Sequence, residues 1–202
     1  MSRTNAVAVN PSMSDLAAPA VTADLLNADF FTLLGLPRSF NLDQAVLDAR
    51  FRELQREVHP DRFAASDDAA RRASMMLATQ INEGYQTLRS PLKRATYMLS
   101  LAGVDIGAES NTAMSPAFLM LQMEWREQVA DARADKDLAA LQTLETDVSE
   151  AIRTSYVELG ARLECLTPGS NTQPAVEAVR QLMFLEKLYE EIDNAIFDLE
   201  DL

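Results

Sequence analysis

Residues 41–63 read NLDQAVLDARFRELQREVHPDRF, and this stretch decides how the N-terminal half of the chain folds. Apolar side chains recur at helical spacing through its first part, which predicts an amphipathic helix. Asn41, followed three residues later by Gln44, predicts the N-terminal cap of this helix. The helix must end by about Val58, because Pro60 disfavours the α conformation for the residue before it. The apolar stripe consists of Leu47, Phe51, Leu54 and Val58.

Helical patterns flank this stretch on both sides. Before it, Asp29 is expected to cap a short helix that stops at Gly35 and Pro37. After a loop that starts at His59, residues 66–68 (Ser-Asp-Asp) are expected to cap a longer helix and to place acids at its positive end. This helix is expected to end before Pro91. Its buried stripe consists of Leu77, Ile81, Tyr85 and Leu88.

Three more long helical patterns fill the second half of the chain. They cover residues 115–134, a stretch that ends near Leu163, and residues 175–199 after a clear turn at 166–174. Long connected helices predict an antiparallel three-helix bundle, and no segment has the alternation of a β-strand. We therefore expect an all-α fold. Its predicted parts are a tail at 1–28, a helical-hairpin module at 29–101, a linker at 102–114 and the bundle at 115–202.

The composition limits the classes of function. The chain has 202 residues, of which 48% are hydrophobic, so it can bury one or two cores. Residues 1–102 carry 11 acidic and 11 basic side chains, and residues 103–202 carry 20 acidic and 7 basic ones, which gives the net charge of −13. The acidity of the chain argues against nucleic acid as the main partner. The asymmetry between its halves suggests that the two modules bind different partners.

Single residues exclude further kinds of site. Cys165 is the only cysteine and His59 the only histidine, so an intramolecular disulfide, a zinc ribbon and a multi-histidine metal site are impossible. No apolar run approaches the roughly 18–20 residues that cross a bilayer. Residues 1–28 lack the apolar segment of a secretory signal and are expected to form a mobile tail. We expect a cytoplasmic protein that binds no metal, cofactor or membrane.

The loop after the first long helix concentrates groups suited to recognition. Its proline stiffens a turn that carries an imidazole and a carboxylate side by side. Two arginines lie one helical turn apart on the preceding helix and share a face, and a third follows the loop. This basic strip on an acidic protein fits an acidic partner surface. The candidate contacts are His59, Pro60, Asp61, Arg52, Arg56 and Arg62.

Two other interpretations of the loop remain open. The tripeptide alone is compatible with an ordinary turn beside a solvated basic face. A catalytic pair of His59 and Asp61 would need a nucleophile or a positioned water. Cys165 lies in the other module, where we expect it to pack as a small hydrophobic side chain. We do not expect an enzyme.

The predicted helix at 115–134 has two apolar faces, whereas a bundle helix needs one. At about 100° per residue, one stripe is the natural core face. The second stripe is rich in methionine and bordered by acids, which is typical of an interface with a polar rim. Packing under the linker or on the first module is the alternative. The core stripe is Phe118, Leu121, Trp125, Val129 and Ala132, and the second face is Leu119, Met120, Met123, Glu124, Glu127 and Asp131.

The last predicted helix offers a companion to the second face. Its main stripe faces the core, while Phe184 lies about 100° from the middle of that stripe. Phe184 either fills the edge of the bundle or stands beside the second face. The main stripe is Leu182, Leu185, Leu188, Tyr189, Ile192 and Ile196.

The segment from Asp29 to Ser100 resembles a J-domain. The resemblance rests on a short first helix (DFFTLLGL), a second ending in LQREVHPDRF and a third carrying ATQINEGYQTLRSP. It implies that the His-Pro-Asp loop, with the three arginines as docking contacts, binds a DnaK-type ATPase chaperone and stimulates its ATP hydrolysis. Gly84 replaces the alanine usual in the family, which lowers helix propensity by about 0.8–1 kcal/mol but keeps a close helix approach.

Nearly the whole chain from Asp29 is similar to the HscB family of iron–sulfur cluster co-chaperones. The similarity rests on SPAFLMLQMEWRE, LRSPLKRATYMLSLAGVD and VRQLMFLEKL. It implies that the C-terminal bundle binds an IscU-type scaffold and delivers it to the chaperone HscA. Met123 and Asp131 stand where the family has Leu and Glu. The implied scaffold contacts are Leu119, Met120, Met123, Glu124, Glu127, Asp131 and Phe184.

The expected function is therefore that of a monomeric co-chaperone in iron–sulfur cluster assembly. It would hold an IscU-type scaffold and an HscA/DnaK-type ATPase chaperone together. Two alternatives remain open. One is a J-domain adaptor that recruits its chaperone to an unrelated client, such as a membrane or secretion complex. The other is a helical metal or cluster enzyme.

Overall fold

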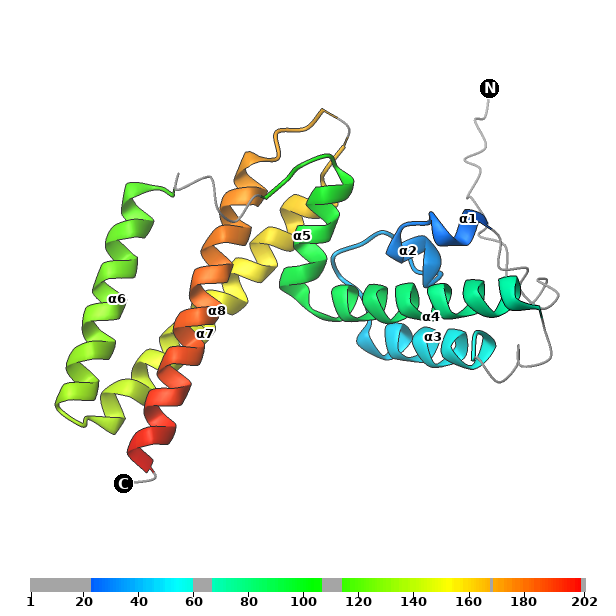
Figure 1. The fold of residues 1–202 in the computed structure, drawn as a ribbon. Coiled ribbons are helices and arrows are strands. Elements are labelled where there is room, and N and C mark those ends of the chain that lie inside the picture. The colour runs from blue at the N-terminus through cyan, green and yellow to red at the C-terminus, as the bar shows by residue number, and fades with distance from the viewer. Residues whose placement is uncertain (1–22, 60–66, 107–113, 168, 201–202) are drawn as a thin grey trace. The chain divides into compact units, whose positions relative to one another are not determined.

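The structure is a computed structural model that describes residues 23–59, 67–106, 114–167 and 169–200. Within these ranges every regular element is an α-helix, which confirms the predicted all-α fold. The helices are α1 (Ala23–Leu26), α2 (Phe30–Leu33), α3 (Gln44–Glu57), α4 (Asp68–Arg89), α5 (Pro91–Leu101), α6 (Pro116–Ala134), α7 (Leu138–Glu164) and α8 (Gln173–Glu200) (Figure 1).

The chain folds into two compact units. The first draws on Met1–Pro37 and Gln44–Gln86, and the second on Arg38–Asp43 and Thr87–Leu202. Helix α5, which the sequence analysis did not assign, packs on α7 and α8 and belongs to the second unit. This division follows packing. The boundaries predicted for the two modules, 29–101 and 115–202, stay a prediction.

Helix α2 begins at an aspartate cap. Asp29 Oδ1 accepts hydrogen bonds from the N–H groups of Phe31 at 2.9 Å and Thr32 at 3.0 Å, so two donors of the first turn are satisfied. The chain then turns at Gly35, whose φ of 64° is left-handed. A side chain at Gly35 would also meet Arg50. The predicted cap and the predicted stop at Gly35 are confirmed.

Helices α3 and α4 form the predicted helical hairpin (Figure 1). The rings of Phe51 and Tyr85 stack with centroids 4.0 Å apart, and the Tyr85 hydroxyl donates to Asp48 Oδ1 at 2.9 Å. At the end of the hairpin where the chain passes from α3 to α4, the Ser74 hydroxyl donates to the Val58 carbonyl at 2.8 Å. The predicted stripe residues are buried, except for the partly buried Phe51: Leu47, Leu54, Val58, Leu77, Ile81, Tyr85 and Leu88.

Gly84 lets α2 approach α4 closely. A Cβ atom at Gly84 would lie 3.1–3.3 Å from atoms of the Phe30 side chain. Any larger residue would therefore force Phe30 to move. The close approach expected at Gly84 is made to α2.

The cap predicted for α3 at Asn41 is wrong. The helix begins at Gln44, so Asn41 lies outside it, and its N–H donates to Ser39 Oγ at 3.1 Å. The Gln44 side chain donates forward to Asp48 Oδ1 at 2.8 Å and does not close a capping box. At α4 the prediction holds, because Asp67 Oδ1 accepts the Ala70 N–H at 2.7 Å.

Helices α6, α7 and α8 form the predicted three-helix bundle of the second unit (Figure 1). At the start of α6, Ser115 Oγ accepts the Phe118 N–H at 3.3 Å, and Pro116 occupies the first turn. Proline is favourable there because its missing N–H would have no partner in the helix. The core contains Val129, Ala132, Leu141, Leu144, Val148, Leu185, Leu188, Ile192 and Ala195.

Two tyrosine–glutamate hydrogen bonds connect α7 to α8. The Tyr156 hydroxyl donates to Glu186 Oε1, and the Tyr189 hydroxyl donates to Glu145 Oε1 at 2.9 Å. Burial is the main cause that raises the pKa of Tyr156, and the hydrogen bond to Glu186 is the second. The bond to Glu145 raises the pKa of Tyr189. Both hydroxyls therefore remain donors at neutral pH and tie the two longest helices together.

Candidate functional site

The first candidate surface lies at the C-terminal end of α3. Arg52, Arg56 and His59, which together are named the α3 surface, are all exposed. Arg56 lies in the last turn of the helix, where a cation complements the negative end of the helix dipole. The other predicted members, Pro60, Asp61 and Arg62, lie outside the described residues.

The local fold fixes where the α3 surface begins. Val58 is buried, and its carbonyl oxygen accepts the Ser74 hydroxyl of α4. His59 follows directly and is exposed. An anchored residue thus precedes the imidazole, and the two arginines lie on the helix that leads to it. The α3 surface offers positive charge and an imidazole to an acidic partner.

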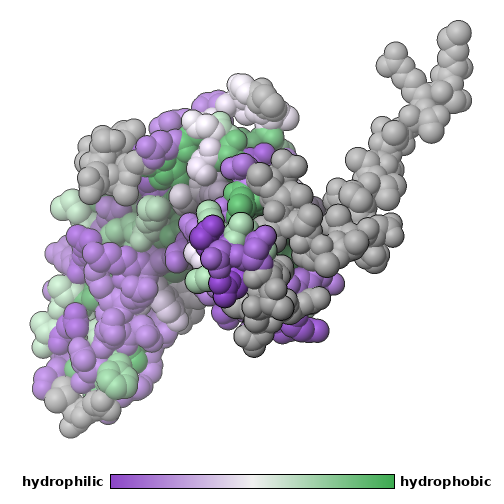
Figure 2. Space-filling model, turned by 45° about the vertical axis from the view of Figure 1, so that its right-hand side comes forward, coloured by the Kyte–Doolittle hydropathy of each residue, from purple (hydrophilic) through white to green (hydrophobic). Residues whose placement is uncertain are grey.

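The second candidate surface runs along α6. It is named the α6 face and consists of Leu119, Met120, Met123, Glu124, Glu127 and Asp131. All six side chains are exposed, with exposed fractions of 43% for Leu119, 64% for Met120 and 72% for Met123. None of them contributes to the bundle core. Hydrophilic residues predominate on the coloured part of the face that Figure 2 shows. Among the helices in the described ranges, α6 exposes the most large hydrophobic side chains, four with Leu121 included.

The opposite side of α6 supplies the core, with one exception. Phe118, Val129 and Ala132 are buried, and the partly buried Trp125 packs against the core. Leu121 is 36% exposed, which corrects its predicted place in the core stripe. The core cluster takes residues of α6 only from Trp125 onward, so Leu121, one turn earlier, has no part in it.

Phe184 of α8 lies at the edge between α8 and α6. Its ring meets that of Phe118 edge to face, with centroids 5.8 Å apart and an interplanar angle of 85°. The guanidinium carbon of Arg126 lies 5.4 Å from the centroid of the Phe184 ring. Phe184 therefore fills the bundle edge, where two side chains of α6 contact its ring. Arg126 was not predicted; the signal for it is a single base between Glu124 and Glu127.

Comparisons with known proteins bear on the whole chain. The family model for the HscB C-terminal oligomerisation domain matches residues 114–193. The co-chaperone protein HscB homolog of Paraburkholderia xenovorans is 53% identical over 176 residues, which cover 87% of this chain and 98% of that protein. The chain belongs to the HscB family of co-chaperones.

Solved HscB structures share the fold. Chaperone HscB from Vibrio cholerae matches with a TM-score of 0.72 and 38% identity over 85% of this chain and 99% of that one. Human co-chaperone HscB matches with a TM-score of 0.73 and 29% identity over 83% of this chain and 81% of that one. The similarity to HscB-type co-chaperones inferred from the sequence motifs is thereby confirmed.

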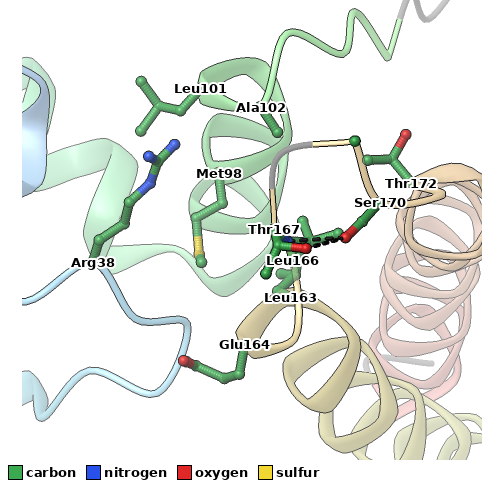
Figure 3. A pocket seen from close by; sticks show the side chains of 11 residues that line it. Arg38, Met98, Leu101, Ala102, Leu163, Glu164, Leu166, Thr167, Ser170 and Thr172 are labelled. Atoms are coloured by element: carbon green, nitrogen blue, oxygen red, sulfur yellow. Dashed lines mark hydrogen bonds between the residues drawn. The ribbon is translucent and has the colours of Figure 1, made fainter.

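A cavity of about 340 Å³ in the second unit of this HscB-family chain lies among α5, the end of α7 and the turn that follows it (Figure 3). Glu164 at its edge accepts the Ser39 hydroxyl at 2.6 Å and the Phe40 N–H at 2.7 Å. The bond from Ser39 is the main cause that lowers the pKa of Glu164. Since this carboxylate holds the segment Arg38–Asp43 on α7, we assign it a structural role.

Cys165 does not pack as predicted. It is the C-cap residue of α7 and is exposed, because the chain leaves the helix at this point. In the described ranges, no helix combines the length and apolar character needed to cross a membrane. The same ranges contain no group of three or more His, Cys, Asp or Glu side chains arranged to hold a metal ion.

Proposed function

We propose that this HscB-family chain is an adaptor between two proteins. Its bundle binds an IscU-type iron–sulfur scaffold through the α6 face and Phe184. Its His59-Pro60-Asp61 loop, with Arg52, Arg56 and Arg62, contacts an HscA/DnaK-type ATPase chaperone and stimulates ATP hydrolysis. The chain itself has no catalytic residue in this scheme.

The observation that carries the scaffold assignment is the exposure of the α6 face. Leu119, Met120 and Met123 leave apolar area in water that the bundle does not need. Contact with a partner would remove that area from water, which is favourable by about 25 cal/mol of free energy per Å² of apolar surface. The exposed acids around it form the polar rim that an interface requires. These are the positions that the family resemblance implies for contact with the scaffold.

The chaperone assignment is supported by the chemistry of the α3 surface. Two arginines and a histidine are exposed at the end of a helix in a chain with a net charge of −13. A local positive surface on an acidic protein attracts an acidic partner, and the negative charge on the rest of the protein repels that partner from other positions. The family resemblance supplies the identity of that partner.

Holding both partners at once explains how the adaptor works. The module proposed at 29–101 would bind the chaperone while the module at 115–202 binds the scaffold. The local concentration of scaffold at the chaperone then rises without any new contact. We expect a cytoplasmic monomer. Light scattering during size-exclusion chromatography tests the monomer directly.

The proposal is tested by measuring scaffold binding calorimetrically and chaperone ATPase rates with the full chain. We expect saturable scaffold binding and a stimulated ATPase rate. Stimulation without scaffold binding would instead favour a J-domain adaptor for a different client. Scaffold binding without stimulation would remove the His-Pro-Asp loop from the mechanism.

A further inference from the structure

Two of the three apolar side chains in the α6 face are thioethers. Met120 and Met123 are three residues apart, so their side chains share one face of the helix. They are 64% and 72% exposed. A dissolved oxidant therefore reaches both sulfur atoms without any unfolding. By contrast, Met98 of α5 is only 6% exposed.

We infer that Met120 and Met123 form a reversible oxidation site that switches scaffold binding off. The inference rests on the proposed scaffold-binding function of the α6 face. It adds a modification chemistry and a regulatory consequence to that surface. The oxidant it requires is hydrogen peroxide or a related peroxide.

The chemical step is an oxygen transfer. A lone pair on the thioether sulfur attacks one peroxide oxygen, the O–O bond breaks, and an S–O bond forms. Sulfur loses two electrons and becomes a sulfoxide, while the second peroxide oxygen leaves as water after proton transfer. A methionine sulfoxide reductase reverses the step with two thiols, which become a disulfide as the sulfoxide oxygen leaves as water.

The product is unsuited to the interface. A sulfoxide is polar, so burying it against an apolar partner surface requires a hydrogen bond that the reduced contact did not need. The apolar centre of the α6 face would shrink to Leu119, with the acids around it unchanged. Because neither methionine contributes to the bundle core, the fold itself should tolerate the change.

The chain provides its own comparison. Met75 and Met76 of α4 are 62% and 57% exposed and belong to the first unit. Peroxide should convert them as readily as Met120 and Met123. The inference assigns them no part in scaffold binding. Loss of scaffold binding must therefore follow the state of the α6 methionines and not the total number of sulfoxides.

The experiment uses the full chain with the substitution Cys165→Ser, because the exposed thiol of Cys165 would also react. The protein is treated with hydrogen peroxide, and catalase removes the peroxide before untreated scaffold is added. Peptide mass spectrometry reports conversion at each methionine, and calorimetry reports the dissociation constant. Met75→Leu/Met76→Leu and Met120→Leu/Met123→Leu are the matched variants.

Oxidation should weaken scaffold binding by at least about tenfold, given the value of burying one methionine side chain. The Met75→Leu/Met76→Leu variant should lose as much on oxidation. The Met120→Leu/Met123→Leu variant, whatever its starting affinity, should show no further loss. Treatment with the two methionine sulfoxide reductases should restore binding to the parent protein.

Four results would overturn the inference. Unchanged affinity after full conversion of Met120 and Met123 would show that oxidation does not act there. If these two sulfurs stay reduced under conditions that convert Met75 and Met76, they are not an oxidation site. Melting of the bundle on oxidation would show an effect through the fold. Absence of scaffold binding by the untreated protein would overturn the proposed function together with the inference. The untreated sample therefore separates this failure from a failure of the inference alone.

Discussion

The Arg126 guanidinium lies over the ring of Phe184, with 5.4 Å between its central carbon and the ring centroid. Arg126 belongs to α6 and Phe184 to α8, and Phe118 meets the same ring edge to face. The α6 helix thus sets the position of the one proposed scaffold contact that α6 does not carry. This relationship makes the proposed scaffold surface a property of two helices.

Replacing Arg126 should weaken scaffold binding without unfolding the bundle. A cation over an aromatic ring at an exposed site contributes about 0.5–1 kcal/mol. Arg126→Met should therefore raise the dissociation constant by about twofold to fivefold, and Arg126→Lys should recover part of that loss. Arg133→Met removes the same charge near the end of α6 and serves as the control. Equal effects at both positions would mean that charge alone matters.

Replacing the α6 methionines should separate binding from stability. Met120→Ser/Met123→Ser should change the free energy of unfolding by less than about 0.5 kcal/mol, because both side chains are exposed. The same change should weaken scaffold binding by at least about tenfold. Met75→Ser/Met76→Ser is the matched control and should leave binding unchanged. A bundle that melts early by circular dichroism would place these residues in the core.

Removing the Tyr156 hydroxyl should destabilise the second unit. Tyr156→Phe breaks the bond to Glu186 and leaves that partly buried carboxylate without its donor. We expect a loss of about 1–3 kcal/mol in urea unfolding. Val157→Ala changes the next, exposed residue of α7 and should alter stability by less than about 0.5 kcal/mol.

The same bond should give the stability a pH dependence at the alkaline end. The pKa of Tyr156 is raised in the folded state above its ordinary value of 10.0. The folded state therefore binds the proton more tightly than the unfolded state. The contribution to stability is fully present below pH 10.0 and is lost as pH rises toward the folded pKa. Wild type should lose this contribution above that pH, and Tyr156→Phe should not.

Glu164 should produce the opposite dependence at acid pH. Its pKa is lowered from 4.5, mainly by the Ser39 hydroxyl, so its contribution is present above that value and is lost as pH falls through the folded pKa. Glu164→Gln should lower stability at pH 7 by less than about 1 kcal/mol, since the site is exposed. The difference from wild type should vanish under acid conditions in urea unfolding. Glu158→Gln removes the same charge from another exposed position of α7 and serves as the control at pH 7.

Local chemistry explains what the sequence could predict. Asp29 and Asp67 cap their helices as expected, because a cap depends on residues three positions away. The exposed side of α6 was also predictable, since helical spacing alone separates Met120 and Met123 from the core stripe. The cap predicted at Asn41 is wrong because the helix begins only at Gln44, whose side chain bonds forward to Asp48.

Contacts between distant residues explain what the sequence could not predict. Helix α5 was not assigned, although Ser90 and Pro91 carry the local signals for its start; its Arg94 is a charged residue that a sequence pattern places in water. Arg94 is nevertheless buried: it donates to the Leu88 carbonyl at 2.7 Å and lies 5.0 Å from the centroid of the Phe40 ring. Arg126 was missed for the same reason, since its partner lies on another helix. No periodicity within one segment reports such a pairing.

The central claim is that one chain holds chaperone and scaffold at the same time. It is tested most directly by the ATPase rate of the DnaK-type chaperone with this chain alone, with scaffold alone and with both. We predict that the increase in rate with both proteins exceeds the sum of the increases that each produces alone. His59→Gln should abolish the stimulation that this chain provides, while scaffold binding persists. An additive rate, or normal stimulation by His59→Gln, would contradict the account.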